Sequence, residues 1–129
     1  MTKKIILYVE DNPANLDLIC SFLGAYKNIS MISAMSAEDG LSILDEVLPD
    51  LILLDINLPG ISGIELLKQL KTNVKTKHIP VLAMTASVML QDIEDGFSSG
   101  FDDYLTKPVD LEILSATILD HLGIDEFIR

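Results

Sequence analysis

Charged and hydroxyl side chains stand directly after four apolar runs of this chain. The runs IILYV, LILL, VLAM and DDYLT are followed, in chain order, by Glu10 and Asp11, by Asp55, by Thr85, and by Lys107. In an open α/β sheet, ligands bind at the carboxyl ends of the strands. Carboxylates, a hydroxyl and an ammonium group at one such edge are suited to binding a hard cation and a phosphoryl group.

The acidic residues of this set predict a metal site. Carboxylates that lie close together repel one another unless a cation lies among them. Mg²⁺ takes oxygen ligands, keeps several waters and commonly uses one or two carboxylates plus a phosphate. We therefore expect Asp11 and Asp55 to be direct ligands, Glu10 to hold a metal-bound water, and the backbone carbonyl of Asn57 to supply a further ligand. A single carboxylate at a strand end is usually a helix cap or a solvated loop residue. The presence of three such carboxylates together with a lysine at matching strand ends is what favours a site.

The remaining polar residues have both structural and functional interpretations. Lys107 is the only base in FDDYLTKPVD; it serves as a counter-ion to the acids and can also pair with a phosphoryl oxygen. Pro108 permits a cis Lys107–Pro108 bond. Thr85 is placed either to cap a following helix or to bond a phosphoryl oxygen, and Tyr104 is expected to be partly buried.

Apolar runs of strand length alternate with segments of helical periodicity along the whole chain. The expected strands are 4–9, 29–34, 50–54, 79–84 and 101–105, and the expected helices are 13–25, 36–47, 62–74, 87–98 and 110–122. This alternation predicts a doubly wound α/β fold with a parallel sheet and helices on both faces. Runs that are apolar at every position indicate strands buried on both faces. The second strand ends without a charged residue, so we expect it at an edge.

Sequence signals also mark the helix starts. Asn12 precedes Pro13, which is typical of an N-cap followed by proline in the first turn. Ser36 and Ser62 each precede an acidic residue by three positions, as in a capping box. Asp110 is expected to cap the last helix.

Composition narrows the classes of function. The chain has 129 residues, of which 49% are apolar, so one packed domain over 1–129 is expected, with a core of about 3–122 and a short tail. A net charge of -11 argues against direct nucleic-acid binding and against docking to anionic membranes. No apolar stretch approaches the ~20 residues of a membrane span, and the start lacks the features of a signal peptide. The single cysteine, Cys20, is in keeping with the cytoplasm.

Four motifs together carry a resemblance to a known family. VEDN at 9–12, LLDINLPGISGIELL at 53–67, MTA at 84–86 and DDYLTKP at 102–108 resemble the receiver domain of two-component response regulators (CheY-like). The resemblance implies a flavodoxin-like fold with strand order 2-1-3-4-5 and five helices. It also implies these roles: Asp55 as phosphoacceptor, Glu10 and Asp11 as the acidic pair, the Asn57 carbonyl as a metal ligand, Lys107 as the phosphoryl-binding lysine, and Thr85 and Tyr104 as switch residues.

The resemblance further implies a signalling switch rather than a turnover enzyme. The phosphoryl group is expected from a phosphohistidine of a sensor histidine kinase or phosphotransfer protein, with Mg²⁺ as cofactor. The face formed by the fourth helix, fifth strand and fifth helix is expected to bind a downstream protein, and phosphorylation-linked dimerisation is compatible with this behaviour. We expect Asn57 and Ser87, each two residues after a site residue, to tune loss of the phosphoryl group.

Three other readings stay open at this stage. A Mg²⁺-dependent phosphatase of the haloacid dehalogenase type also uses a strand-end aspartate, but usually has a second aspartate where this chain has Asn57. A flavodoxin-like cofactor binder needs a phosphate loop after the first strand, where this chain has EDNPAN. A docking-only pseudo-receiver would not need the combination of Asp55, Thr85 and Lys107.

Overall fold

The computed structural model describes residues 2–58, 60–86 and 100–129. In chain order its elements are β1 (Lys4–Val9), α1 (Pro13–Gly24), β2 (Ile29–Ala34), α2 (Ala37–Leu44), β3 (Leu51–Asp55), α3 (Gly63–Thr72), β4 (Val81–Thr85), β5 (Asp103–Thr106) and α5 (Leu111–Leu122). The strands pair in parallel in the order β2-β1-β3-β4-β5. The predicted α/β fold and strand order are therefore confirmed. The predicted helix at 87–98 lies outside the described residues.

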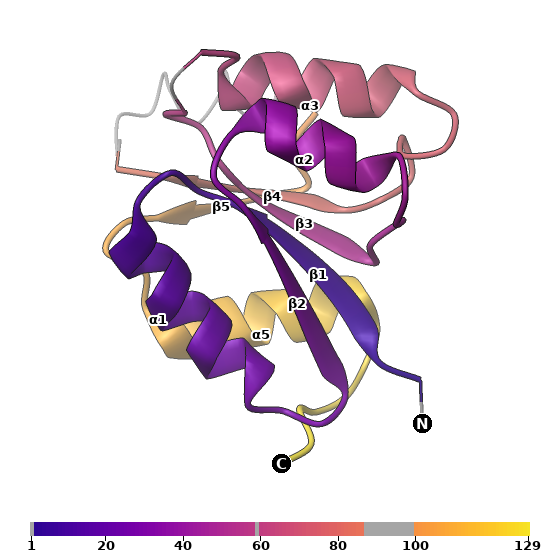
Figure 1. Cartoon of the computed structure of the whole chain (residues 1–129). Coiled ribbons are helices and arrows are strands. Elements are labelled where there is room, and N and C mark those ends of the chain that lie inside the picture. Colours follow the sequence, from indigo (N-terminus) through magenta and orange to yellow (C-terminus); the bar gives the residue numbers. More distant parts are fainter. Residues whose placement is uncertain (1, 59, 87–99) are drawn as a thin grey trace.

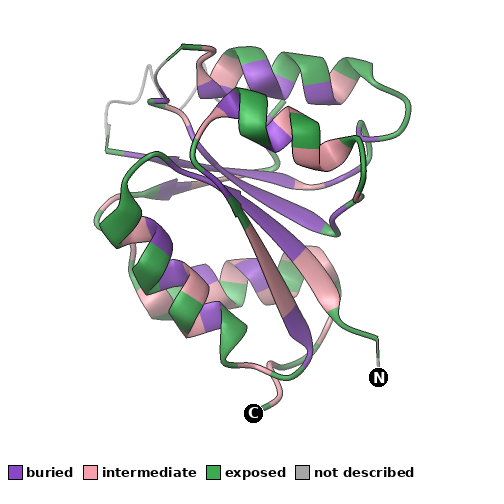
Figure 2. Cartoon of the chain, in the orientation of Figure 1, coloured by how far each residue is buried: buried purple, intermediate pink, exposed green. Residues whose placement is uncertain are grey.

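The sheet has an apolar core on each face. Figure 1 shows α1 and α5 on one face and α2 and α3 on the other. Every residue of β3 and β4 is buried, as the continuous apolar runs predict, whereas the edge strand β2 has an exposed residue and several half-buried ones (Figure 2). Burying the central strands from both sides fixes where their carboxyl ends lie.

The four described helices begin at the predicted caps. Side-chain oxygens accept backbone N–H bonds in the first turn at Asn12, Ser36, Ser62 and Asp110. Each cap satisfies N–H groups that have no partner within the helix. With Asn12 as its cap, α1 begins at Pro13, two residues after Asp11, and so lies close to the acidic end of β1.

Several predicted boundaries were wrong by two or three residues. The second helix ends at Leu44 rather than at 47, because the bond from Glu46 N–H to the Ile43 carbonyl, 3.0 Å, tightens the chain into a turn. β4 starts at Val81 rather than at 79, since Ile79 N–H closes a turn on the Thr76 carbonyl. β5 comprises 103–106 rather than 101–105.

The loop from β3 to α3 comes very close to the sheet. A Cβ atom on Gly63 would lie 2.5 Å from the carbonyl oxygen of Asp55 and 2.7 Å from Cα of Ile56. Gly63 N–H also donates to the Ile56 carbonyl at 3.1 Å. Only glycine allows α3 to begin at this distance from the end of β3, so this contact helps to hold Asp55 in place.

The residues after α5 pack against the turn between α1 and β2. Asn28 donates to the Glu126 carbonyl at 3.1 Å and accepts from Ile128 N–H at 2.9 Å. The ring of Phe127 stacks on Tyr26 with centroids 4.8 Å apart. Within the described residues, no helix has the length and hydropathy needed to span a membrane.

Candidate functional site

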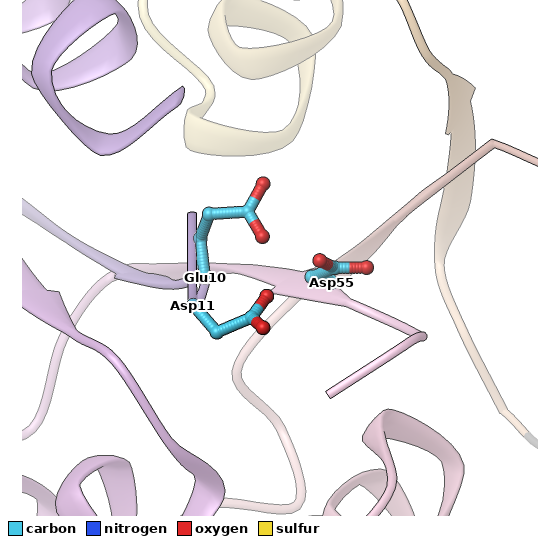
Figure 3. A group of neighbouring side chains, drawn as sticks. All are labelled: Glu10, Asp11 and Asp55. Carbon is cyan, nitrogen blue, oxygen red and sulfur yellow. The ribbon is translucent and has the colours of Figure 1, made fainter. Parts of the chain in front are cut away.

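Neighbouring strands bring the acidic residues together. β1 pairs with β3 in a register that sets Val9 beside Leu54, so the residues that follow these two lie at one edge. Oxygen atoms of Glu10, Asp11 and Asp55 all lie within 4.8 Å of one another. In Figure 3 the carboxylates of Glu10 and Asp11 lie near each other, with Asp55 beside them on the neighbouring strand. Glu10 and Asp55 are 0% and 4% exposed, whereas Asp11 is open to solvent.

Lys107 is the cation of this group. Its Nζ lies 2.7 Å from Glu10 Oε1 and 3.1 Å from Asp55 Oδ2. The end of β5 places it there, because Lys107 N–H donates to the Thr85 carbonyl at 2.7 Å. The Lys107–Pro108 bond is cis, which the proline at 108 permits. The cluster contains three carboxylates, and the Lys107 ammonium pairs with two of them, so an excess of negative charge is left that a divalent cation would offset.

Asp55 has a donor on each oxygen. Asn57 N–H donates to Oδ1 at 2.9 Å and Lys107 donates to Oδ2. Burial, and after it the neighbouring Glu10 carboxylate, raises the pKa of Asp55 to about 6, and the two donors only partly oppose this rise. Near neutral pH Asp55 is therefore mostly an ionised, poorly hydrated carboxylate, which is suited to nucleophilic attack.

The donors that Glu10 has within the described residues all meet one of its two oxygens. Oε1 accepts from Lys107, from Asn15 Nδ2 at 3.0 Å and from the Tyr8 hydroxyl at 3.2 Å. Burial acts to raise the pKa of Glu10, but coupling to Asp55, which is the carboxyl of the pair that takes up the proton first, and the hydrogen bonds from Lys107 and Asn15 outweigh burial and lower the pKa of Glu10 well below the usual range. Oε2 is buried and has no hydrogen-bond partner among residues 2–58, 60–86 and 100–129. A buried anionic oxygen without a donor fits a site that takes a cation or a cation-bound water.

Sequence reasoning did not identify Tyr8 and Asn15 as members of the site. One signal was present, because residues two apart on a strand point to the same face, which places Tyr8 beside Glu10. Asn15 follows the N-cap of α1 by three residues, and the position of that helix relative to β1 was needed to bring its amide to Glu10.

The other predicted residues lie near the cluster or outside the described part. Thr85 ends β4 and is 2% exposed, with its strand neighbour Thr106 leading into Lys107. Tyr104 is half-buried on β5 and packs against the core between the sheet and the α2–α3 layer. Asn57 is exposed and meets Asp55 through its N–H. Ser87 lies outside the described residues, so its predicted role is untested.

Comparison with known proteins places these features in one family. The model of the response regulator receiver domain matches residues 6–119. The chain is 38% identical over 123 residues to the polar-differentiation response regulator DivK of Brucella ovis, covering 95% of this chain and 98% of that protein. A probable cyclic di-GMP phosphodiesterase of Vibrio cholerae is 38% identical over 117 residues, but this chain spans only 26% of its length.

A solved structure supports the same relationship. The receiver domain of the sensor histidine kinase PA1611 from Pseudomonas aeruginosa, which holds a magnesium ion in its active-site cleft, superposes with a TM-score of 0.82. It is 26% identical, and the match covers 95% of this chain and 99% of that one.

Proposed function

This chain belongs to the response regulator receiver domain family of two-component signalling, and on that premise we propose that it is a cytoplasmic phosphoaccepting switch in which Asp55 receives the phosphoryl group. The observation that carries the proposal is the surroundings of Asp55. It is buried, lies 3.1 Å from Lys107, and shares a cluster of oxygens within 4.8 Å with Glu10 and Asp11.

The proposed reaction is a transfer from nitrogen to oxygen. A carboxylate oxygen of Asp55 attacks the phosphorus of a phosphohistidine, a P–O bond forms, and the P–N bond breaks with its electron pair left on the imidazole nitrogen. The product is an acyl phosphate. The Asn57 N–H donates to the Asp55 carboxylate and orients it. Lys107, which contacts the same carboxylate, would pair with the negative charge on the phosphoryl oxygens during transfer.

The residues present fit a magnesium ion. Asp11 and Asp55 are the proposed direct ligands, the Asn57 carbonyl a third, and Glu10 the acceptor for a bound water. The open oxygen of Glu10 and the excess of carboxylates over ammonium groups support this assignment. When bound, Mg²⁺ supplies charge compensation for the phosphoryl group during transfer.

The donor is proposed to be a sensor histidine kinase or a histidine phosphotransfer protein. The acyl phosphate then favours one of two conformations, with Thr85 drawn to the phosphoryl group and Tyr104 turning inward. Such a modification shifts an equilibrium only through its different interaction with the two states. The face that includes β5 and α5 is proposed to bind a downstream protein partner, with dimerisation on phosphorylation as one form of output.

The phosphatase alternative lacks a general acid. Asn57 occupies the position two residues after Asp55, and an amide does not donate and recover a proton as a carboxylic acid does. Cleavage of a small phosphoester with turnover would restore that alternative. A docking-only pseudo-receiver remains the outcome if no phosphoryl group is accepted.

The direct test is phosphorylation by a small donor such as acetyl phosphate, with and without Mg²⁺, read by intact mass. We expect wild type to gain one phosphoryl group only with Mg²⁺, and Asp55→Ala to gain none. Asp17→Ala, an exposed aspartate on α1, is the matched control and should behave as wild type. A wild-type protein that gains no mass at any Mg²⁺ concentration would overturn the proposal.

A second measurement addresses the lifetime of the phosphorylated state. We propose that Asn57 and Ser87 contact the water that attacks the acyl phosphate. Variants at either position should change the phosphoryl half-life, followed by mass after the donor is removed. Unchanged half-lives in both variants would rule this role out without affecting the assignment of Asp55.

A further inference from the structure

Tyr8 is the one polar side chain in the β1 run from Ile5 to Val9. Its side chain is fully buried in the core beneath α1 and α5. The hydroxyl donates to Glu10 Oε1 at 3.2 Å. A phenylalanine would fill the same space without a polar atom that needs a partner. The distinctive contribution of the tyrosine is therefore its bond to a carboxylate of the site.

The two oxygens of the Glu10 carboxylate have different surroundings. Tyr8, Asn15 and Lys107 all donate to Oε1, and Oε2 is buried with no hydrogen-bond partner in the part of the chain that the structure describes. A carboxylate held by three donors on one oxygen does not rotate freely. Its other oxygen is thereby left for the cation or for a water on that cation.

If Lys107 pairs with the phosphoryl group in the phosphorylated protein, it does not orient Glu10 to the same extent there as in the unphosphorylated protein. It already divides its contacts between Glu10 and Asp55. When Lys107 pairs with a phosphoryl oxygen, the hydrogen bonds from Tyr8 and Asn15 still orient Glu10. These two neutral donors are separate from the phosphoryl chemistry.

A cavity of about 430 Å³ lies beside these donors. Tyr8, Asn15 and Lys107 all line it, whereas the fully buried Glu10 does not. Each of the three donors therefore both lines the cavity and contacts the Glu10 carboxylate. A Tyr8→Phe variant keeps the ring that lines this cavity and loses only the hydroxyl that contacts Glu10.

We propose that Tyr8 is a positioning residue for the cation site, acting through Glu10 and assisted by Asn15. The proposal rests on the function assigned above. Replacing a residue that hydrogen-bonds to a metal-binding side chain commonly lowers metal affinity by about 10–100-fold. We expect an effect at the lower end for Tyr8, because Asn15 and Lys107 remain.

The test is a Mg²⁺ titration of the metal-free full chain by calorimetry and by tyrosine difference absorption. Tyr8→Phe should weaken Mg²⁺ binding by about tenfold. Wild type should show a tyrosine difference band that saturates with Mg²⁺, and Tyr8→Phe should lose most of it. Tyr26→Phe, at the turn between α1 and β2, is the matched control and should keep both the affinity and the band. Asn15→Ala should weaken binding in the same direction.

A purely structural role predicts a different pattern. Tyr8→Phe would then lower the melting temperature equally with and without Mg²⁺ and leave the Mg²⁺ affinity within about twofold of wild type. That result overturns the proposal, as does a wild-type protein that binds no Mg²⁺.

The two proposals fail separately. If wild type accepts a phosphoryl group and Tyr8→Phe binds Mg²⁺ as wild type does, only the role of Tyr8 is lost. If wild type binds Mg²⁺ with the Tyr8 band but accepts no phosphoryl group, only the proposed function is lost.

Discussion

Asp55 combines the features that a nucleophile needs with a cost to stability. It is buried beside another carboxylate, and its pKa is raised from 3.8 to about 6. A group whose folded-state pKa is raised stabilises the fold fully below its unfolded pKa, and this contribution is lost as the pH rises through the folded value. Near neutral pH the metal-free protein therefore holds an ionised Asp55 at the expense of stability.

Asp55→Asn should remove this cost. Without Mg²⁺, the variant should be more stable than wild type by on the order of 1–3 kcal/mol near pH 8. The difference should shrink as the pH falls through about 6, because wild-type Asp55 then binds a proton. Thermal melts in a chelator between about pH 5 and about pH 8 measure it. A variant that melts below wild type across this range would contradict the crowding of Asp55 and Glu10.

At the scale of elements, the start of α3 is as important as the strand ends. The missing Cβ of Gly63 lets the first turn of α3 approach the backbone of Asp55 and Ile56. An added methyl group at this place would meet backbone atoms, which do not move aside as a flexible side chain does. The nucleophile is therefore held partly by the packing of a neighbouring helix.

Gly63→Ala should destabilise the protein by about 2 kcal/mol and slow phosphorylation, because the end of β3 has to shift. Gly24→Ala is the control, since the nearest tertiary contact of a Cβ there, among the described residues, is Met31 Cγ at an ordinary 3.8 Å. Gly24→Ala should keep or slightly raise stability. Chemical denaturation of both variants measures the difference, and equal stabilities would show that the contact at Gly63 is not as close as described.

Sequence periodicity was sufficient for the fold but not for every boundary. The apolar runs and the four caps predicted the sheet and the helix starts, because burial and capping depend on local residue types. The end of α2 was predicted too late, because the apolar pattern continues past Leu44 while the bond of Glu46 N–H to Ile43 turns the chain.

The functional site was likewise predicted only in part from the sequence. Strand-end position was enough to group Glu10, Asp55 and Lys107, since parallel strands end at one edge. The bonds from Tyr8 and Asn15 to Glu10 depend on the distance between β1 and α1, and no sequence pattern reports that distance.

At the scale of the whole molecule, a net charge of -11 adds a second source of repulsion. Charges spread over the surface destabilise a compact chain through self-repulsion, and any salt screens them. A stabilising effect of Mg²⁺ is therefore evidence for the site only when this general screening has been separated from it.

Asp11 makes that separation practicable, because it is an exposed member of the cluster and its replacement leaves the core intact. KCl should raise the melting temperature of wild type and variants alike. MgCl₂ at the same ionic strength should stabilise wild type further, by about 2.7 kcal/mol at ~100 times the dissociation constant. Asp11→Asn should lose this additional stabilisation, while Asp17→Asn, which removes one exposed charge on α1, should keep it. An equal additional stabilisation in the two variants would show that Asp11 does not take part in Mg²⁺ binding, because they differ only in whether the lost charge belongs to the cluster. If MgCl₂ stabilises wild type no more than KCl does at the same ionic strength, Mg²⁺ acts by screening alone.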